Sequence, residues 1–160
     1  SDFDKVIGVT LRGAFLVARE AARQMVDQIE EDGERAEDVR RRYAIINMSS
    51  VNGVMAIPDQ LAYCATKGAI NQLTKSMSLS LARYGIRVNA IGPGSINTDV
   101  LKSVNDNPAA LEKIMSRTPL QRIGDPDEVA SVASFLASKG IVSRRASGCS
   151  SASAFSCWCA

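Results

Sequence analysis

Residues 43–50 read YAIINMSS, a continuous apolar run that ends in two serines. Such a run fits a strand that is buried on both faces, as in parallel sheets. Residues 86–94, IRVNAIGPG, form a second run of this kind and end in a proline-glycine turn. The two runs predict neighbouring parallel strands and therefore an α/β fold.

The segment between the two strands is predicted to be a helix over residues 60–84. Its apolar side chains recur at three- and four-residue steps, and Gly85 is well placed to end it. They are Leu61, Ala65, Ala69, Leu73, Met77, Leu81 and Tyr84. The loop before this helix contains the breakers Gly53 and Pro58. Strand, helix and strand in this order make a βαβ unit, whose crossover is almost always right-handed.

The flanking segments predict further helices and a tail. Residues 2–29 show the apolar repeat of one long amphipathic helix. The repeat consists of Phe3, Val6, Ile7, Leu11, Phe15, Ala18, Ala22, Met25 and Ile29. Residues 30–42 are dense in mixed charges and predict a solvated connection, with a partner-docking segment as the alternative. Shorter helices are predicted at 108–116 and 126–138, and residues 139–160, rich in Ser, Ala and Cys, predict a disordered tail.

The composition is that of a globular chain, with 46% hydrophobic and 22% charged residues among 160. A net charge of +2 predicts neither a nucleic-acid partner nor an anionic membrane surface. No apolar run reaches the ~20 residues of a membrane-spanning helix, and the first residues do not have the pattern of a secretory signal. We therefore expect a cytoplasmic protein without a membrane partner. A chain that starts with Ser1 suggests a fragment, a processed chain or a trimmed product.

The cysteines favour reduced thiols over a metal centre. Cys149, Cys157 and Cys159 lie close to the end of the chain, Cys64 lies alone in its middle, and the sequence has no histidine. A Cys-x-Cys pair could bind a soft metal or form a disulfide. Reduced thiols in a cytosolic protein are the plainer interpretation, and we expect no metal ligands.

Tyr63 and Lys67 point to proton chemistry. They lie four residues apart, on one face of the predicted helix, so the lysine ammonium can favour the phenolate form of the tyrosine. A phenol tuned in this way can give or take a proton as a ketone and an alcohol interconvert. The Ser49-Ser50 pair at the end of the first strand could polarise the carbonyl oxygen. Surface packing with an extended lysine side chain is the alternative explanation of the pair.

Position favours the chemical interpretation. In open α/β sheets, ligands bind at the carboxyl ends of the strands. Ser50 closes the first predicted strand, Pro93 and Gly94 close the second, and the tyrosine helix connects the two. These features are expected to meet at one edge of the sheet.

The order and spacing of IINMSS, YCATK and RVNAIGPGSINTD resemble the short-chain dehydrogenase/reductase family over about residues 2–138. The resemblance implies part of a Rossmann-type doubly wound parallel sheet that binds NAD or NADP. The catalytic serine, tyrosine and lysine of the family match Ser50, Tyr63 and Lys67. By this resemblance Tyr63 is the acid/base, Ser50 orients the substrate carbonyl, and Lys67 tunes Tyr63 and holds the nicotinamide ribose.

The same resemblance assigns the segment after the second strand. The proline-glycine turn of the family matches Pro93 and Gly94, with Ile96 and Thr98 beside the nicotinamide carboxamide. Arg87 and Asn89 are expected to be structural.

Three features depart from the family pattern. The family asparagine in the first long helix is replaced by Thr10, within VTLRG, which weakens a proton relay through water. No glycine-rich phosphate-binding turn precedes the catalytic region, so residues 1–138 are interpreted as a partial domain with reduced cofactor affinity. Residues 139–160 stand where the family has a final strand, and an alternative exon or a shifted reading frame would produce such a change.

Two functions follow from these observations. The first is NAD(P)-dependent hydride transfer between a small-molecule alcohol and a ketone. The alternative is a catalytically inactive chain derived from the same family that acts as an interaction or oligomerisation module. The helices at 2–29 and 60–84 resemble the pair that builds the oligomer interfaces of the family, so a homo-oligomer is expected.

Overall fold

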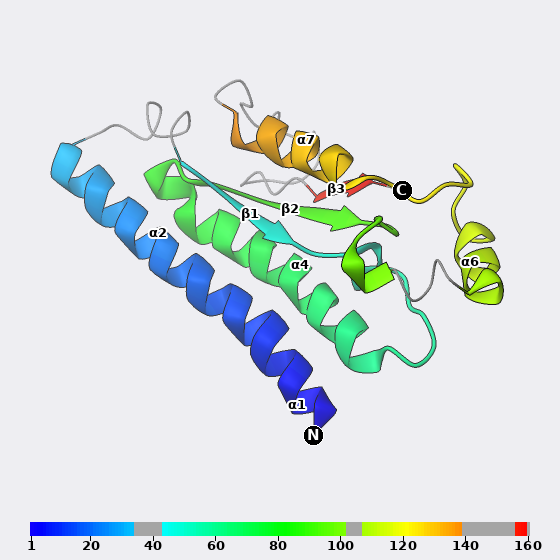
Figure 1. Ribbon diagram of the computed structural model, residues 1–160. Coiled ribbons are helices and arrows are strands. Elements are labelled where there is room, and N and C mark those ends of the chain that lie inside the picture. Colours follow the sequence, from blue (N-terminus) through cyan, green and yellow to red (C-terminus); the bar gives the residue numbers. More distant parts are fainter. Residues whose placement is uncertain (34–42, 102–106, 139–155, 160) are drawn as a thin grey trace, which may run out of the picture.

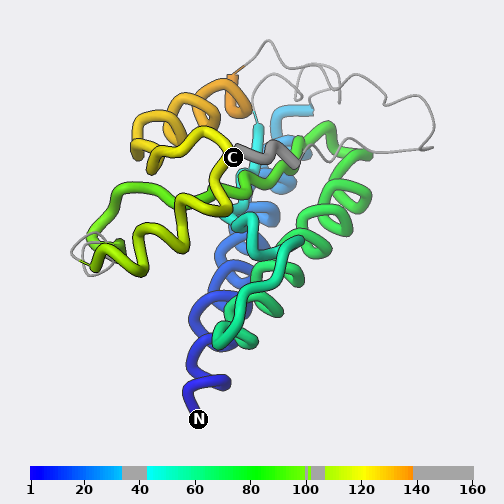
Figure 2. Tube along the Cα trace, turned by 90° about the vertical axis from the view of Figure 1, so that its right-hand side faces the viewer, coloured from blue at the N-terminus to red at the C-terminus, as the bar shows by residue number. Residues whose placement is uncertain are grey.

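A computed structural model describes residues 1–33, 43–101, 107–138 and 156–159 of the chain. The described part is an α/β structure with a sheet of three parallel strands in the order β1-β2-β3. Helices α2 (Gly13–Asp32) and α4 (Leu61–Leu81) cover one face of the sheet, and α7 (Pro126–Ala137) lies against the other (Figures 1 and 2). The predicted α/β class with parallel strands is confirmed.

The chain starts with a long helical run, as the sequence predicts. It consists of α1 (Asp2–Val6), a π-helical turn at Ile7–Arg12 and α2. Ser1 caps the run through a capping box with Asp4, and Gly33, at φ 62°, ends it in the left-handed region that suits glycine. The π-helical turn was not predicted, because the apolar repeat passes through it without a break.

The predicted βαβ unit is present. Strand β1 (Ala44–Met48) pairs in parallel with β2 (Arg87–Pro93), and α4 connects them. A 3-10 turn at Ala82–Tyr84 continues α4, and Gly85, at φ 77°, ends it. The register places Ile45 opposite Val88.

The core lies between α2 and the sheet. Ala18, Ala22 and Ile29 of α2 pack with Ile45, Ile86 and Val88, and all six residues are at most 8% exposed. The two alanines bring α2 close to the strands, so the βαβ unit and the first helix share one apolar layer. Among the described residues, the structure contains no helix that combines the length and the apolar character needed to span a membrane.

The burial predicted for the first strand is wrong. Strand β2 is buried along almost its whole length, but β1 is buried only on alternate residues, and Met48 is 47% exposed. On α4 the side that faces the sheet carries Thr66, Ile70 and Thr74, while Leu61 is 78% exposed. The apolar repeat of this helix packs against the core only at its carboxyl end, through Met77 and Leu81. Nearer the amino end, polar side chains of β1 supply partners for polar side chains of α4.

The remaining elements follow β2. A 3-10 turn at Asp99–Leu101 leads towards α6 (Pro108–Met115), and α7 follows. The helices predicted at 108–116 and 126–138 agree with α6 and α7 to within one residue at each end. Both begin with a capping residue before proline, Asn107 for α6 and Asp125 for α7.

The structure differs from the sequence prediction in the tail. Residues 156–159 form strand β3 (Ser156–Cys159), which pairs in parallel with β2, whereas a disordered tail was predicted for 139–160. Composition gives no sign of this pairing, which depends on the open edge of β2. Residues 139–155 and 160 lie outside the described part, as do residues 34–42 of the predicted charged connection.

Hydrogen bonds from Arg87 connect α7 to the sheet. Arg87 opens β2 and is 9% exposed. Its guanidinium donates to three carbonyls at the end of α7, from Nη1 to Leu136 O at 2.5 Å and from Nη2 to Ala137 O at 3.2 Å and Ser138 O at 3.3 Å. The last carbonyls of a helix have no partner within it, so Arg87 caps α7. This contact gives Arg87 the structural role expected from the sequence.

Replacing Arg87 with methionine should lower the free energy of unfolding by about 1.5–3 kcal/mol, the range for a hydrogen bond to a charged group. The reason is that methionine keeps the apolar stem but leaves the carbonyls of α7 without a donor. Urea unfolding followed by circular dichroism measures the change. The control is Arg83→Met, at an exposed arginine, for which we expect a change of less than about 0.5 kcal/mol. Equal effects of the two substitutions would contradict the capping role.

Candidate active site

The carboxyl ends of β1 and β2 form one edge of the sheet, and the predicted site residues lie along it. The Ser49 amide, directly after β1, donates to Ile91 O of β2 at 2.7 Å. Ser50 follows on the first strand, and Pro93 is the last residue of the second. The structure thus brings the end of one strand against the end of the other, as the sequence predicts.

Ser50 caps a short 3-10 turn at Val51–Gly53. Its Oγ accepts a hydrogen bond from the Asn52 amide at 3.2 Å, and the residue is 6% exposed. A hydroxyl that accepts from the backbone keeps its proton for another acceptor. The turn therefore orients Ser50 as a hydrogen-bond donor at the sheet edge.

Tyr63 and Lys67 lie in the first two turns of α4, at the same edge. Lys67 Nζ donates to Met48 O at 2.9 Å and lies 5.5 Å from the centre of the Tyr63 ring. Both side chains are partly buried, and burial lowers the pKa of Lys67 from its ordinary value. The shared helical face of the pair is confirmed, and the lysine links this face to the end of β1.

The segment after β2 leaves the sheet edge and returns to it. Gly94 follows the strand, and Ile96 forms an isolated parallel bridge with Gly124. Two backbone hydrogen bonds hold this bridge, Asn97 N to Gly124 O at 2.8 Å and Gly124 N to Ser95 O at 3.0 Å. Thr98 lies just beyond it and is exposed. The structure therefore ties Ile96 to the start of α7, a contact that the sequence did not predict.

An ion pair between Arg122 and Glu128 links the residues before α7 to the first turn of this helix. Glu128 Oε1 accepts from Arg122 Nη2 at 2.6 Å, and its Oε2 accepts from Arg122 Nη1 and from the Asp125 amide, both at 2.8 Å. The hydrogen bonds from Arg122, followed by the one from the Asp125 amide, lower the pKa of Glu128 to about 2. A Cβ on Gly124 would lie 2.9 Å from Ile96 Cδ1 and 3.3 Å from Glu128 Oε2, so a larger residue here would have to shift the ends of these two side chains.

Thr10, which replaces the family asparagine, lies within the π-helical turn at Ile7–Arg12. This turn contacts α4, and Thr10 is partly buried. Short π-helical turns inside α-helices frequently mark functional positions. The departure in sequence therefore coincides with an irregularity of the helix.

Contacts of Ser49, Gly53 and Asn71 that connect the site are not predicted by the sequence. Ser49 Oγ donates to the Lys67 carbonyl at 3.1 Å, and Asn71 Nδ2 donates to the Gly53 carbonyl at 3.2 Å. From the sequence, Gly53 is expected only as a breaker in the loop, and Ser49 only as one of the two serines that could polarise the carbonyl oxygen. The available signal for Asn71 was a polar residue one turn after Lys67, on the same face of the helix.

Similarity to known proteins is extensive. Residues 1–144 match the family model described as Enoyl-(Acyl carrier protein) reductase. The chain is 38% identical over 138 residues to the 3-oxoacyl-(acyl-carrier-protein) reductase FabG of Rickettsia prowazekii (strain Madrid E), a match that covers 86% of this chain and 51% of the relative.

Two solved structures share the fold. A gluconate 5-dehydrogenase from Burkholderia cenocepacia J2315, in complex with NADP and tartrate, matches with a TM-score of 0.74 at 37% identity, over 86% of this chain and 49% of that one. A 4-hydroxyisoleucine dehydrogenase complexed with NADH matches with a TM-score of 0.76 at 33% identity, over 88% and 54%.

Fold and site together define a Rossmann-type α/β protein with a serine, a tyrosine and a lysine at the carboxyl edge of its sheet. The chain belongs to the short-chain dehydrogenase/reductase family, in agreement with the resemblance seen in its sequence. It spans about half the length of the curated relatives that it matches.

The ion pair between Arg122 and Glu128 should persist at acidic pH. Because the pKa of Glu128 lies below the ordinary 4.5, the pair is intact at neutral pH and is lost only as the pH falls through about 2. In Arg122→Gln the pKa of Glu128 should rise towards 4.5, because the main donor is gone. Carboxyl carbon shifts in a ¹³C NMR titration measure it. Arg117→Gln, at an exposed arginine elsewhere in the same segment, should leave the midpoint near 2, and an unchanged midpoint in Arg122→Gln would refute the assignment.

Proposed function

We propose that this chain carries the catalytic residues of an NAD(P)-dependent oxidoreductase that interconverts a small-molecule alcohol and a ketone. The contact that supports this most strongly is the position of Lys67 Nζ, bound to Met48 O at 2.9 Å and 5.5 Å from the Tyr63 ring centre. It joins the tyrosine helix to the strand end that precedes Ser50. The relatives named above as a reductase and as dehydrogenases support the same reaction class.

Each of the three residues has a separate task in this proposal. Tyr63 gives its phenolic proton to the carbonyl oxygen during reduction and takes a proton from the alcohol during oxidation. Ser50, whose Oγ accepts from the backbone, donates its own proton in a hydrogen bond to the substrate oxygen. Lys67, whose ammonium lies 5.5 Å from the centre of the Tyr63 ring, would hold the cofactor beside the tyrosine.

The residues at this edge fit the nicotinamide end of a cofactor. An ammonium has three donors, so Lys67 can bind a ribose hydroxyl and keep its bond to Met48 O. Pro93, Gly94, Ile96 and Thr98 would hold the nicotinamide ring: Gly94 adds no side chain, and Thr98 has an exposed hydroxyl. When bound, the nicotinamide supplies or accepts the hydride. NADH and NADP in the two solved relatives support this cofactor class, and the proposed cofactor is NAD or NADP.

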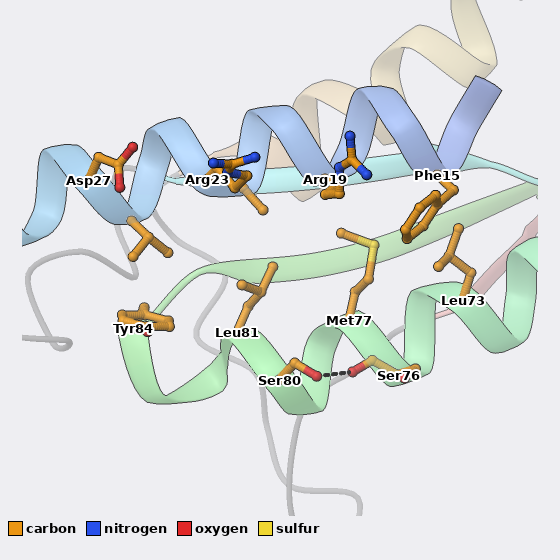
Figure 3. A pocket seen from close by; sticks show the side chains of 12 residues that line it. Phe15, Arg19, Arg23, Asp27, Leu73, Ser76, Met77, Ser80, Leu81 and Tyr84 are labelled. Atoms are coloured by element: carbon orange, nitrogen blue, oxygen red, sulfur yellow. Dashed lines mark hydrogen bonds between the residues drawn. The ribbon is translucent and has the colours of Figure 1, made fainter. Parts of the chain in front are cut away.

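A specific surface supports the expected homo-oligomer. A groove of about 480 Å³ runs between α2 and α4 (Figure 3). Its apolar lining consists of Phe15, Ala22 and Val26 of α2, Leu73, Met77 and Leu81 of α4, and Tyr84 of the 3-10 turn that follows α4. Arg19, Arg23 and Asp27 line the same groove, so two copies related by a two-fold axis could set arginine against aspartate. The same groove also supports the alternative function, a non-catalytic module that assembles through these helices.

The cytoplasmic location expected from the sequence stays a prediction.

Replacing Tyr63 with phenylalanine tests the proposed reaction. Turnover of a ketone panel with NADH or NADPH should fall by ~10²–10⁴-fold, since phenylalanine keeps the ring but cannot transfer a proton. Cofactor oxidation followed by absorbance measures turnover, and fluorescence titration of each cofactor measures binding.

The matched control is Tyr43→Phe, which removes a hydroxyl bound to Gln28 Oε1 away from the site. It should leave turnover unchanged. Binding of neither cofactor at millimolar concentration by the unmodified chain would exclude the catalytic function and favour the interaction module.

Replacing Met77 with aspartate tests the oligomer. A buried carboxylate in the groove should convert an oligomer into monomers, which sedimentation velocity detects as a smaller mass. Leu79→Asp, at a residue of α4 that is 55% exposed and does not line the groove, should leave the assembly intact. A monomeric unmodified chain at concentrations of ~100 μM would contradict an assembly stable enough to have a specific interface.

A further inference from the structure

The turn that follows Ser50 lies unusually close to α4. A Cβ built on Gly53 would lie 2.8 Å from the Lys67 carbonyl oxygen, 2.9 Å from its carbon and 2.7 Å from Asn71 Nδ2. Side chains in proteins do not approach to these distances, and two of the obstructing atoms belong to the backbone of a helix. The backbone of Gly53 does not adopt positive φ, so the position requires glycine for space.

Three hydrogen bonds surround this close approach. Ser49 Oγ donates to the Lys67 carbonyl at 3.1 Å, Asn71 Nδ2 donates to the Gly53 carbonyl at 3.2 Å, and Lys67 Nζ donates to Met48 O at 2.9 Å. Ser49 is 3% exposed and Asn71 is 9% exposed. The segment that carries Ser50 is therefore attached to α4 on both sides of the serine, and the buried side chains of Ser49 and Asn71 make two of the contacts.

Asn71 contributes to the site through its amide nitrogen, which donates to the Gly53 carbonyl. Its Oδ1 is buried and has no hydrogen-bond partner among the described residues. A rotated amide would set Oδ1 against the Gly53 carbonyl, two acceptors facing each other, so the observed orientation is the favourable one. Leaving the buried Oδ1 unpaired costs free energy. The amide therefore adopts this orientation for the hydrogen bond from Nδ2 to the Gly53 carbonyl.

We propose that Ser49, Gly53 and Asn71 are positioning residues that set the distance from the Ser50 hydroxyl to the Tyr63–Lys67 pair. The proposal rests on the proposed function of these three groups. Ser50 lies between Ser49 and Gly53 in the chain, and both are attached to the helical segment that starts at Lys67. Tyr63 lies one turn earlier on that helix, so the separation of the two hydroxyls follows from these contacts.

Replacing Gly53 with alanine forces the turn away from α4, because the Lys67 carbonyl cannot move without breaking the helix. Ser50 moves with the turn, and a displacement of ~1 Å at a reacting group can cost ~100-fold in rate. We expect kcat to fall by ~100-fold while the KM for the cofactor changes by less than about threefold. The matched control is Gly13→Ala, where the added Cβ would meet only Gly8 O, at 3.9 Å. It should leave both constants unchanged.

A second measurement does not need turnover. Burial lowers the pKa of Lys67, and a turn that has moved off α4 admits water to the ammonium. In Gly53→Ala the pKa of Lys67 should therefore rise towards its ordinary 10.5, and in Gly13→Ala it should not change. A ¹³C NMR titration of labelled lysine measures it, with Lys67→Arg to assign the resonance. If Gly53→Ala does not fold, Asn71→Ala replaces it, because that variant removes one attachment without adding an obstruction and should raise the pKa in the same direction.

The outcomes separate the two proposals. An unmodified chain that neither binds cofactor nor turns over ketone rejects the proposed function, while the Lys67 titration still tests the attachment. An active chain whose kcat survives Gly53→Ala rejects the positioning role and leaves the proposed function standing. An unchanged Lys67 titration in Gly53→Ala or, in its place, Asn71→Ala also rejects the positioning role.

Discussion

The parallel pairing of β1 with β2 is the constraint on which the site depends. Two parallel strands can be joined only by a crossover, which α4 provides here. The crossover helix has to start near the edge where the first strand ends and run back along the sheet. Its first turns therefore lie at the carboxyl edge, which is where Tyr63 and Lys67 meet the residues that follow β1.

Polar contacts set how α4 lies on β1. Asn47 Nδ2 donates to Thr74 Oγ1 at 2.9 Å, and both residues are buried. The bond from Ser49 to the Lys67 carbonyl lies further along the same contact, towards the site. Because buried hydrogen bonds are directional, they restrict the rotation and the sliding of a helix more narrowly than apolar packing does. A site that needs two hydroxyls at a set separation benefits from this kind of contact.

The apolar repeat of α4 shows where sequence reasoning succeeds and where it fails. Periodicity correctly predicted the helix, because it depends on residues a few positions apart. It does not show which polar side chains of the helix are buried, because the partner across the interface decides that. Asn47 makes a polar face acceptable to the sheet, while Met77 and Leu81 pack against the core and also line the groove beside α2. Strand β3 was missed for a related reason, since an open strand edge is a property of the assembled sheet.

The sequence by itself determined the order of the first two strands and of the helices, their ends to within a few residues, and the shared face of Tyr63 and Lys67. Capping residues, glycines and apolar spacing act locally, so they can be recognised without a fold. Only the tertiary structure decided that Gly53 lies against the Lys67 carbonyl and that Arg87 caps a helix some fifty residues later. Those contacts join residues far apart in the chain, and their distances exist only once the sheet has brought the segments together.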